Sequence, residues 1–180
     1  MLRVFFLLHN AMKTTQNYSN AQVTWLVILR VFIGWHFMYE GLVKILNPKW
    51  TSLPYLLDSK GPASSFFINL TQNDSVMTLV NICNEWSLFC IGFCLILGVF
   101  SKLASIGGMI LLFAYSLSHP ALIETSYMMP FEGSYLWIDK NLVEFAALGA
   151  LAVFPTSKII GLDRLLIKIL PAGFLKLKLI

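Results

Sequence analysis

The sequence predicts an all-α integral membrane protein: a four-helix bundle with aromatic loops on its outer side and a basic amphipathic helix at the C-terminal end. Of its 180 residues, 57% are hydrophobic and only 12% are charged, whereas soluble domains carry about 25% charged residues. The apolar residues are grouped in blocks long enough to cross a hydrocarbon core of roughly 30 Å. Basic residues cluster near the ends of these blocks and in the tail, as in proteins whose topology follows the positive-inside rule.

The chain divides into a membrane domain and two flanking segments. Residues 1–21 are predicted to be a cytoplasmic leader, because their apolar stretch is too short to span and no small-residue cleavage site follows it. Residues 22–155 form the four-helix transmembrane domain. Residues 156–180 carry five basic residues against one acid, so they are predicted to be a cytoplasmic interfacial tail. The spans are expected at about 22–46, 76–100, 103–118 and 136–154.

Two long polar and aromatic connections separate the spans. Residues 47–75 are too many for a loop without structure, so we expect short helical pieces that lie at the interface or fold over the bundle as a lid. Residues 120–135 form the second connection. Lysine and arginine are concentrated in the termini and at the turn containing Lys102, which predicts a multi-pass topology with both termini cytoplasmic and both connections outside.

The first span carries a stripe of four ionisable side chains, Arg30, His36, Glu40 and Lys44. At about 100° per residue they fall on one side of a helix. Because a central Arg or Lys costs roughly 2.5–3.5 kcal/mol on insertion into lipid, the stripe should face other helices or water.

Polar groups on other spans reach a similar depth. A rise of about 1.5 Å per residue places His36, Glu85 and Glu144 at one level, with Arg30 deeper. Arg30 and Glu85 are expected to form a charge pair, and His36 and Glu40 to share a proton. The sequence thus predicts an outward-facing polar pocket, although the same charges could instead serve only to hold the helices in register. The candidate catalytic residues are Arg30, His36, Glu40 and Glu85, and the candidate ligand-binding residues are Lys44, Asn81, His119, Asn141 and Glu144.

Other chemistries find little support in the residues. A di-iron bundle needs Glu-x-x-His on two helices, and the chain has none, so no metal site is expected. Haem and flavin motifs are also missing. Cys83, Cys90 and Cys94 form one stripe without a Cys-x-x-Cys pair, which predicts packing residues and leaves any redox role open. The net charge of +4 lies mostly at helix ends and in the tail, which suits lipid rather than nucleic acid.

Several motifs resemble the DoxX/DoxD-like family of small four-helix membrane proteins, over roughly residues 24–165. The first span contains Arg30-x-x-x-Gly34 and Gly41-x-x-Lys44. The other matching positions are Glu85, Gly92, the run Leu97-Gly98-Val99-Phe100-Ser101-Lys102-Leu103, the run Asp139-Lys140-Asn141-Leu142, and Gly161-Leu162-Asp163.

The resemblance implies a protein of the bacterial cytoplasmic (inner) membrane. Relatives such as the large subunit of thiosulfate:quinone oxidoreductase imply a quinone-linked oxidoreductase subunit that acts on thiosulfate or another small sulfur or anionic reductant. Arg30, Glu85 and Asn141 would then line the site for the anion or the quinone headgroup, and His36 or Glu40 would pass protons. Quinone is the implied cofactor.

The sequence leaves several alternatives open. The chain could be a non-catalytic assembly or anchoring module whose buried charges are structural, or a small transporter, although inverted repeats are lacking. The lipid bilayer is an expected partner. A membrane or periplasmic partner subunit, a homo-oligomer and the identity of the substrate are not determined by the residues.

Overall fold

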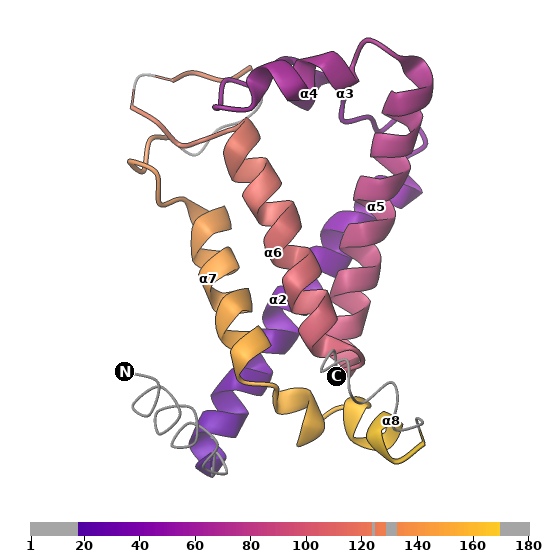
Figure 1. The fold of residues 1–180 in the computed structure, drawn as a ribbon, viewed down its shortest axis with the longest axis vertical. Helices are drawn as coiled ribbons and strands as arrows, with labels where there is room; N and C mark the ends of the chain where they lie inside the picture. The colour runs from indigo at the N-terminus through magenta and orange to yellow at the C-terminus, as the bar shows by residue number, and fades with distance from the viewer. Residues whose placement is uncertain (1–17, 124, 129–132, 170–180) are drawn as a thin grey trace, which may run out of the picture.

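The computed structural model describes residues 18–123, 125–128 and 133–169, with side chains up to residue 166, and these ranges contain helices and no strands. The all-α prediction is confirmed. Most of the predicted leader and the end of the predicted tail lie outside the described residues. The elements in chain order are α2 (Asn20–Leu46), α3 (Leu53–Leu57), α4 (Ser64–Leu70), α5 (Asp74–Leu97), α6 (Ser101–Ser118), α7 (Lys140–Val153), the 3-10 helix η1 (Thr156–Lys158) and α8 (Asp163–Ile169) (Figure 1).

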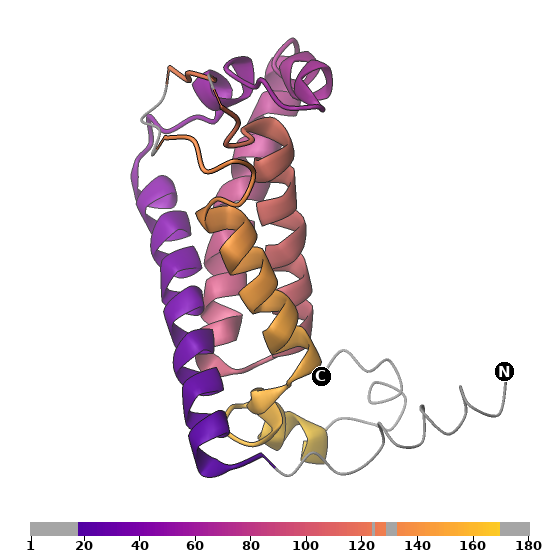
Figure 2. The same cartoon turned by 90° about the vertical axis from the view of Figure 1, so that its left-hand side faces the viewer.

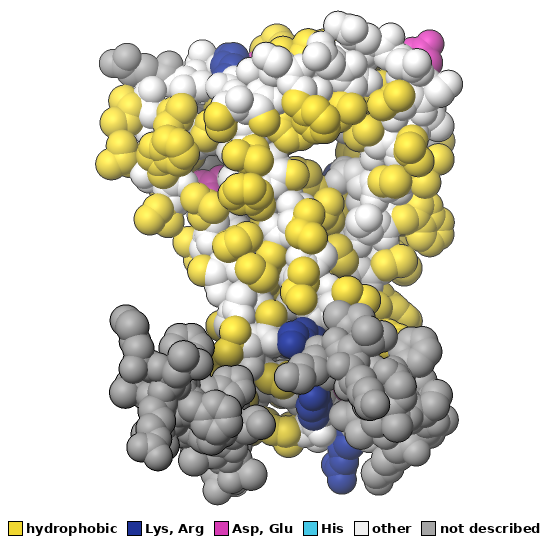
Figure 3. Space-filling model, viewed as in Figure 1, with side chains coloured by type: hydrophobic (Ala, Val, Ile, Leu, Met, Phe, Trp, Pro, Cys, Tyr) yellow, Lys and Arg dark blue, Asp and Glu magenta, His cyan; other side chains and the backbone are white. Residues whose placement is uncertain are grey.

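Helices α2, α5, α6 and α7 form the body of the molecule (Figures 1 and 2). Helix α2 packs most extensively on α5, α6 packs on α7, and α5 and α6 join the two pairs. Helices α2, α5 and α6 are each long and apolar enough to cross a membrane, and hydrophobic side chains cover much of the body's surface (Figure 3). A surface of this kind suits a lipid bilayer. The buried core consists of Ile33, Phe37, Leu88, Leu95, Ala104, Leu112, Leu148 and Leu151.

The fourth predicted span is shorter than expected. Leu136 and Trp137 have positive φ angles of 50° and 83°, so the helix cannot include them, and it begins after Asp139, whose side chain accepts a hydrogen bond from the Leu142 amide. Helix α7 has 14 residues and is therefore about 21 Å long, less than the roughly 30 Å of a hydrocarbon core. The four crossings and the cytoplasmic location of both termini stay predictions.

Glycines allow the backbones of α2 and α5 to come into direct contact. A Cβ atom on Gly92 would lie 2.2 Å from the Met38 amide nitrogen, and one on Gly41 would lie 2.4 Å from the Phe89 amide nitrogen. Both distances are far below van der Waals contact, and the atoms in the way belong to the backbone of the other helix. The two helices can therefore approach this closely only because these positions lack side chains.

We expect Gly92→Ala to destabilise the fold by about 3 kcal/mol, the upper end of the range for overpacking, because backbone atoms cannot move aside. The melting temperature in detergent, followed by circular dichroism, should fall by roughly 6–12 °C. Gly149→Ala is the matched control, since its nearest neighbour would be the Met109 Cε atom at 3.7 Å. Equal melting temperatures for the two variants would contradict this account of the helix crossing.

Two short helices close one end of the bundle. We call residues 50–72, with α3 and α4, the cover, and residues 154–166, with η1 and the start of α8, the base at the opposite end (Figures 1 and 2). The short helical pieces predicted for residues 47–75 are confirmed. The second connection is tied to the cover, because the Lys60 Nζ donates to the Ser126 carbonyl and the Met128 amide donates to the Asp58 carboxylate.

Candidate functional site

A cavity of about 640 Å³ lies beneath the cover, between the four body helices. Leu88, Leu111 and Leu112 contribute to its walls, and cover residues Tyr55 and Phe67 contribute to its roof. The surface is hollowed beneath the cover between α5 and α6 (Figure 3), which places an opening on the side of the bundle. Its lining combines apolar walls with many polar and charged side chains, so it could hold a small organic ligand that has both an apolar ring and polar groups.

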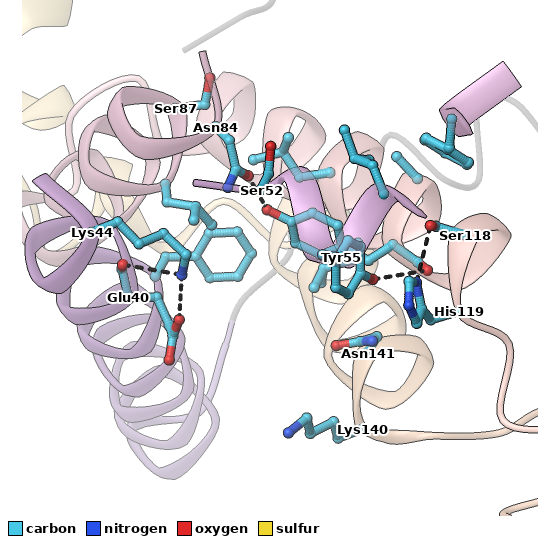
Figure 4. Close-up of a pocket in the computed structure, with 18 of the residues that line it drawn as sticks. Glu40, Lys44, Ser52, Tyr55, Asn84, Ser87, Ser118, His119, Lys140 and Asn141 are labelled. Atoms are coloured by element: carbon cyan, nitrogen blue, oxygen red, sulfur yellow. Dashed lines mark hydrogen bonds and ion pairs between the residues drawn. The ribbon is translucent and has the colours of Figure 1, made fainter. Parts of the chain in front are cut away.

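Two ion pairs lie on the α2 side of the cavity. His36 Nδ1 lies 3.0 Å from a Glu144 carboxylate oxygen and joins α2 to α7. One turn further along α2, Lys44 Nζ lies 2.5 Å from Glu40 Oε2 (Figure 4). All four side chains line the cavity. The proton sharing predicted between His36 and Glu40 is therefore replaced by a contact between helices, because Glu144 reaches His36 and Glu40 turns to Lys44.

The rim of the cavity contains further predicted residues. Asn141 lines it and donates from Nδ2 to Asp139 Oδ2 at 3.1 Å. Lys44 lies 5.7 Å from the centre of the Trp50 ring, which also lines the cavity. Four residues predicted to bind ligand therefore line the cavity: Lys44 on α2, Asn141 and Glu144 on α7, and His119 after the end of α6.

The deepest predicted residue, Arg30, lies outside the cavity. It is 2% exposed and contacts the base, where Nη1 donates to Thr156 Oγ1 at 3.1 Å and Nη2 donates to the Ile160 carbonyl at 2.7 Å. The buried Asp163 carboxylate attracts it electrostatically. The predicted charge pair with Glu85 was wrong, because the chain after α7 folds back and presents its own acceptors to Arg30.

Asp163 joins the base to the turn between α5 and α6. Its carboxylate is fully buried and accepts hydrogen bonds from the Phe100 amide at 2.7 Å and the Ser101 amide at 3.3 Å. These amides belong to the N-terminal end of α6, where a negative charge is favourable. Gly98 has a φ of 64°, and a Cβ atom there would lie 2.9 Å from the Gly161 Cα. The turn and the base are therefore built for close contact.

Glu85 and Asn81 also lie away from the cavity. Glu85 is on the face of α5 that packs on α2, where its carbonyl oxygen would be 2.9 Å from a Cβ atom on Gly41. Asn81 holds the cover: its Oδ1 accepts from the Ser52 amide at 3.0 Å and from the Ser52 hydroxyl at 2.6 Å. Neither residue lines the cavity, since its lining on α5 is formed by the face that contains Val80 and Asn84.

Sequence reasoning missed several polar residues of the cavity, among them Asn84 and Tyr115, which contact each other. The Tyr115 hydroxyl donates to Asn84 Oδ1 and links α6 to α5, and both side chains line the cavity. Asn84 lies three residues after Asn81, so both asparagines fall on the same side of a helix wheel, and the sequence pattern does not show which of them lines a cavity. Nothing in the local sequence indicates that Tyr115 faces inward.

His119 lies under the cover and follows the last residue of α6. Its ring stacks on Tyr55 with centroids 3.8 Å apart and lies near Tyr127 at 4.6 Å. Its Nδ1 is 3.0 Å from Ser118 Oγ, whose own proton goes to Ser59 Oγ. Ser118 Oγ must then accept a hydrogen bond from the Nδ1–H group, which leaves Nε2 as the unprotonated nitrogen of a neutral ring. That nitrogen is buried without a hydrogen-bond partner among the described residues.

Burial lowers the pKa of His119 to about 4, a shift that Asp58 opposes and Lys60 reinforces. Because an unfolded histidine has a pKa of about 6.5, the unfolded state binds the additional proton between these values. Stability should therefore fall as the pH drops from 6.5 towards 4. His119→Phe keeps an aromatic ring against Tyr55 but cannot titrate, so its melting temperature should vary less over this range. Parallel wild-type and variant slopes would contradict the prediction.

The comparisons with known proteins point to one family. A family model described as DoxX matches residues 25–120, more than half of the 180-residue chain. The chain belongs to the DoxX family. Comparisons with curated proteins and with solved structures gave no match. The resemblance predicted from short motifs is thus confirmed at the level of the family.

The motif residues of this DoxX chain serve mainly its architecture. Gly41 and Gly92 form the crossing of α2 with α5. Arg30 and Gly98 hold the base, which contains Asp163, against α2 and the turn after α5. The cavity lies at the other end of the bundle, and four other motif residues line it: Lys44, Asp139, Lys140 and Asn141.

Proposed function

We propose that this DoxX-family membrane protein is a quinone-linked oxidoreductase subunit whose headgroup site is the cavity beneath the cover. The observation that carries the proposal is the cavity itself: about 640 Å³, apolar on its walls, open at the side of the bundle, and bordered by the His36–Glu144 pair. Sites for small organic ligands commonly have volumes of roughly 300–1,000 Å³.

The residues present fit a quinone headgroup. Leucine side chains on α5 and α6 offer an apolar surface for the ring, and the opening between these helices would admit a lipid-soluble molecule from the bilayer (Figure 3). A quinone, when bound, takes up two electrons and two protons to become a quinol. The chain itself must therefore supply groups that hold and move protons at the cavity wall.

His36 and Glu144 are the groups best placed to handle those protons. They lie 3.0 Å apart, so a proton can pass between imidazole and carboxylate without rearrangement of either helix. Glu40 follows His36 by one turn on the same wall and lies nearer the cover, with Lys44 as its partner. Together these side chains form a polar path along α2 from the middle of the cavity towards the cover.

The reductant would be thiosulfate or another small sulfur or anionic compound, and its electrons would pass to the quinone. Lys44 and Lys140 line the cavity, and cationic groups of this kind raise the local concentration of anions. Arg30, which the resemblance assigned to the anion, is committed to the base. In this proposal it has no contact with the reductant.

A non-catalytic assembly or anchoring module is the second candidate. One observation favours it: Arg30 and Asp163 are buried and hydrogen-bonded within the chain, and neither residue lines the cavity. That observation concerns only the base and its contact with Arg30, whereas the ion pairs beneath the cover border open space.

The experiment uses the protein reconstituted in lipid nanodiscs. We expect quinone to copurify with it, and thiosulfate or sulfide to reduce an added short-chain benzoquinone, followed by loss of the quinone's ultraviolet absorbance. His36→Phe should lower the reduction rate by about 100-fold or more, the scale of general acid–base catalysis. Thr78→Val, an exposed position on α5, serves as the control. If the wild-type protein neither binds nor reduces quinone, the proposal of an oxidoreductase subunit is wrong and the non-catalytic module is the better explanation.

A further inference from the structure

The amide of Asn84 is held in one orientation within the cavity. The Tyr115 hydroxyl on α6 donates to Asn84 Oδ1 on α5. A tyrosine hydroxyl has a single proton, and an asparagine amide has one oxygen that accepts and one NH₂ group that donates. Because the oxygen is the partner of Tyr115, the NH₂ group is the end of Asn84 that remains for another contact.

Tyr115 is itself fixed by the cover and by the end of α6. Its ring packs edge-on against Tyr55, with centroids 6.2 Å apart. Its carbonyl oxygen accepts from the His119 amide at 2.8 Å. These contacts hold the Tyr115 hydroxyl against Asn84, and rotation of the Asn84 amide would break the hydrogen bond between them.

The NH₂ group of Asn84 and the hydroxyl of Ser87 have no acceptor among the described side chains. The two residues lie three positions apart on α5, so they share one face of the helix, and both line the cavity (Figure 4). Their neighbours in the lining include Val80, Leu88 and Leu111, which offer no hydrogen bonds. Neither atom is among the buried polar atoms without a partner, so both can reach water through the cavity. A ligand acceptor that displaces this water can take over its hydrogen bonds.

We propose that the Asn84 NH₂ group, oriented by Tyr115, donates a hydrogen bond to a carbonyl oxygen of the ligand and thereby positions its headgroup. The inference rests on the proposed function, since a quinone is the carbonyl compound assigned to the cavity. It adds a specificity-determining contact that neither the charged pairs nor the family motifs supply. The carbonyl would lie against α5, and the opposite side of the headgroup would face His36 and Glu144.

The carbonyl acceptor could belong to a quinone or to the ester group of a lipid, so the experiment must distinguish these two ligands. Wild-type and variant proteins are reconstituted in nanodiscs of ether-linked lipids, which have no carbonyl groups. A short-chain benzoquinone labelled with ¹³C at its carbonyls is then added. Infrared difference spectra measure the carbonyl stretch of the bound molecule, and quenching of tryptophan fluorescence gives the Kd.

In the wild type we expect one carbonyl band to move to lower frequency than in lipid alone. Asn84→Leu should abolish this shift and raise the Kd about tenfold, which corresponds to about 1.4 kcal/mol. Tyr115→Phe keeps the ring and leaves Asn84 in place but frees its amide to rotate, so it should reduce the shift without changing the fold. Thr78→Val on the exposed face of α5 should leave the band and the Kd unchanged.

Two results would overturn the inference in different ways. If the wild type binds quinone and the shifted band persists in both Asn84→Leu and Tyr115→Phe, the contact is wrong while the proposed function stands. If the wild type binds no quinone in ether lipid, the proposed function fails, and with it the assignment of Asn84 to a quinone carbonyl. A carbonyl shift on ¹³C-labelled ester lipid in that second case would assign the cavity to lipid.

Discussion

Arg30→Met should destabilise the protein by about 3–5 kcal/mol, because two hydrogen bonds donated by a charged group are lost, at about 1.5–3 kcal/mol each. The guanidinium is 2% exposed, and the variant leaves the Thr156 hydroxyl and the Ile160 carbonyl without their donor. The melting temperature in detergent should fall by at least roughly 6 °C. Limited proteolysis should also cut the segment after α7 more rapidly, because Arg30 holds Thr156 and the Ile160 carbonyl against α2.

The control and the readout separate a structural role from a role in binding. Arg164→Met removes an exposed positive charge from α8 and should leave the melting temperature nearly unchanged, as is usual for surface positions. Folded Arg30→Met protein should bind benzoquinone with the wild-type Kd, because the residue does not line the cavity. A variant with normal stability and lost binding would show instead that Arg30 acts at the ligand.

Ala114→Trp should abolish quinone binding while the bundle stays folded. Ala114 lines the cavity from α6, and an indole at this position would project into the open volume rather than into packed core. The proposed ligand and the indole would then compete for the same space, so we expect the Kd to rise at least about 100-fold, or about 2.7 kcal/mol. Fluorescence titration with the short-chain benzoquinone measures the change.

Ala146→Trp provides the matched control, since Ala146 is exposed on α7 and a tryptophan there would face lipid. Its Kd should equal that of the wild type. If Ala114→Trp binds quinone as tightly as Ala146→Trp does, with both proteins folded, the headgroup does not occupy this cavity.

The sequence determined the fold class and the approximate position of every long helix. Blocks of apolar residues interrupted by Asn-Pro, Ser-Lys and His-Pro predict spans because backbone hydrogen bonds must be satisfied within a membrane. The same reasoning made the last predicted span too long at its start. Leu136 and Trp137 have positive φ angles, and hydropathy does not reveal them. Hydropathy predicts whether a residue lies in lipid or in water, and it carries no information on the φ and ψ angles of that residue.

The candidate site was predictable in part. The cavity is lined by five of the predicted residues on α2 and α7, His36, Glu40, Lys44, Asn141 and Glu144. They could be predicted because helix periodicity and depth can be calculated from the local sequence. The partners of these side chains are not local. Glu144 reaches His36 from a helix that lies more than a hundred residues later, and the pairing depends on how α7 rotates against α2.

Tertiary structure alone decided the roles of Arg30 and Asn84. Both are polar residues within apolar spans, so their cost in lipid predicts that each faces inward but not what it meets. The fold brings residues 156–163 back beneath Arg30 and surrounds it with acceptors, whereas it leaves the Asn84 amide facing open space beside Tyr115. The sequence by itself determined a membrane bundle with buried polar groups; the packing of distant segments decided which of those groups are satisfied within the chain and which remain for a ligand.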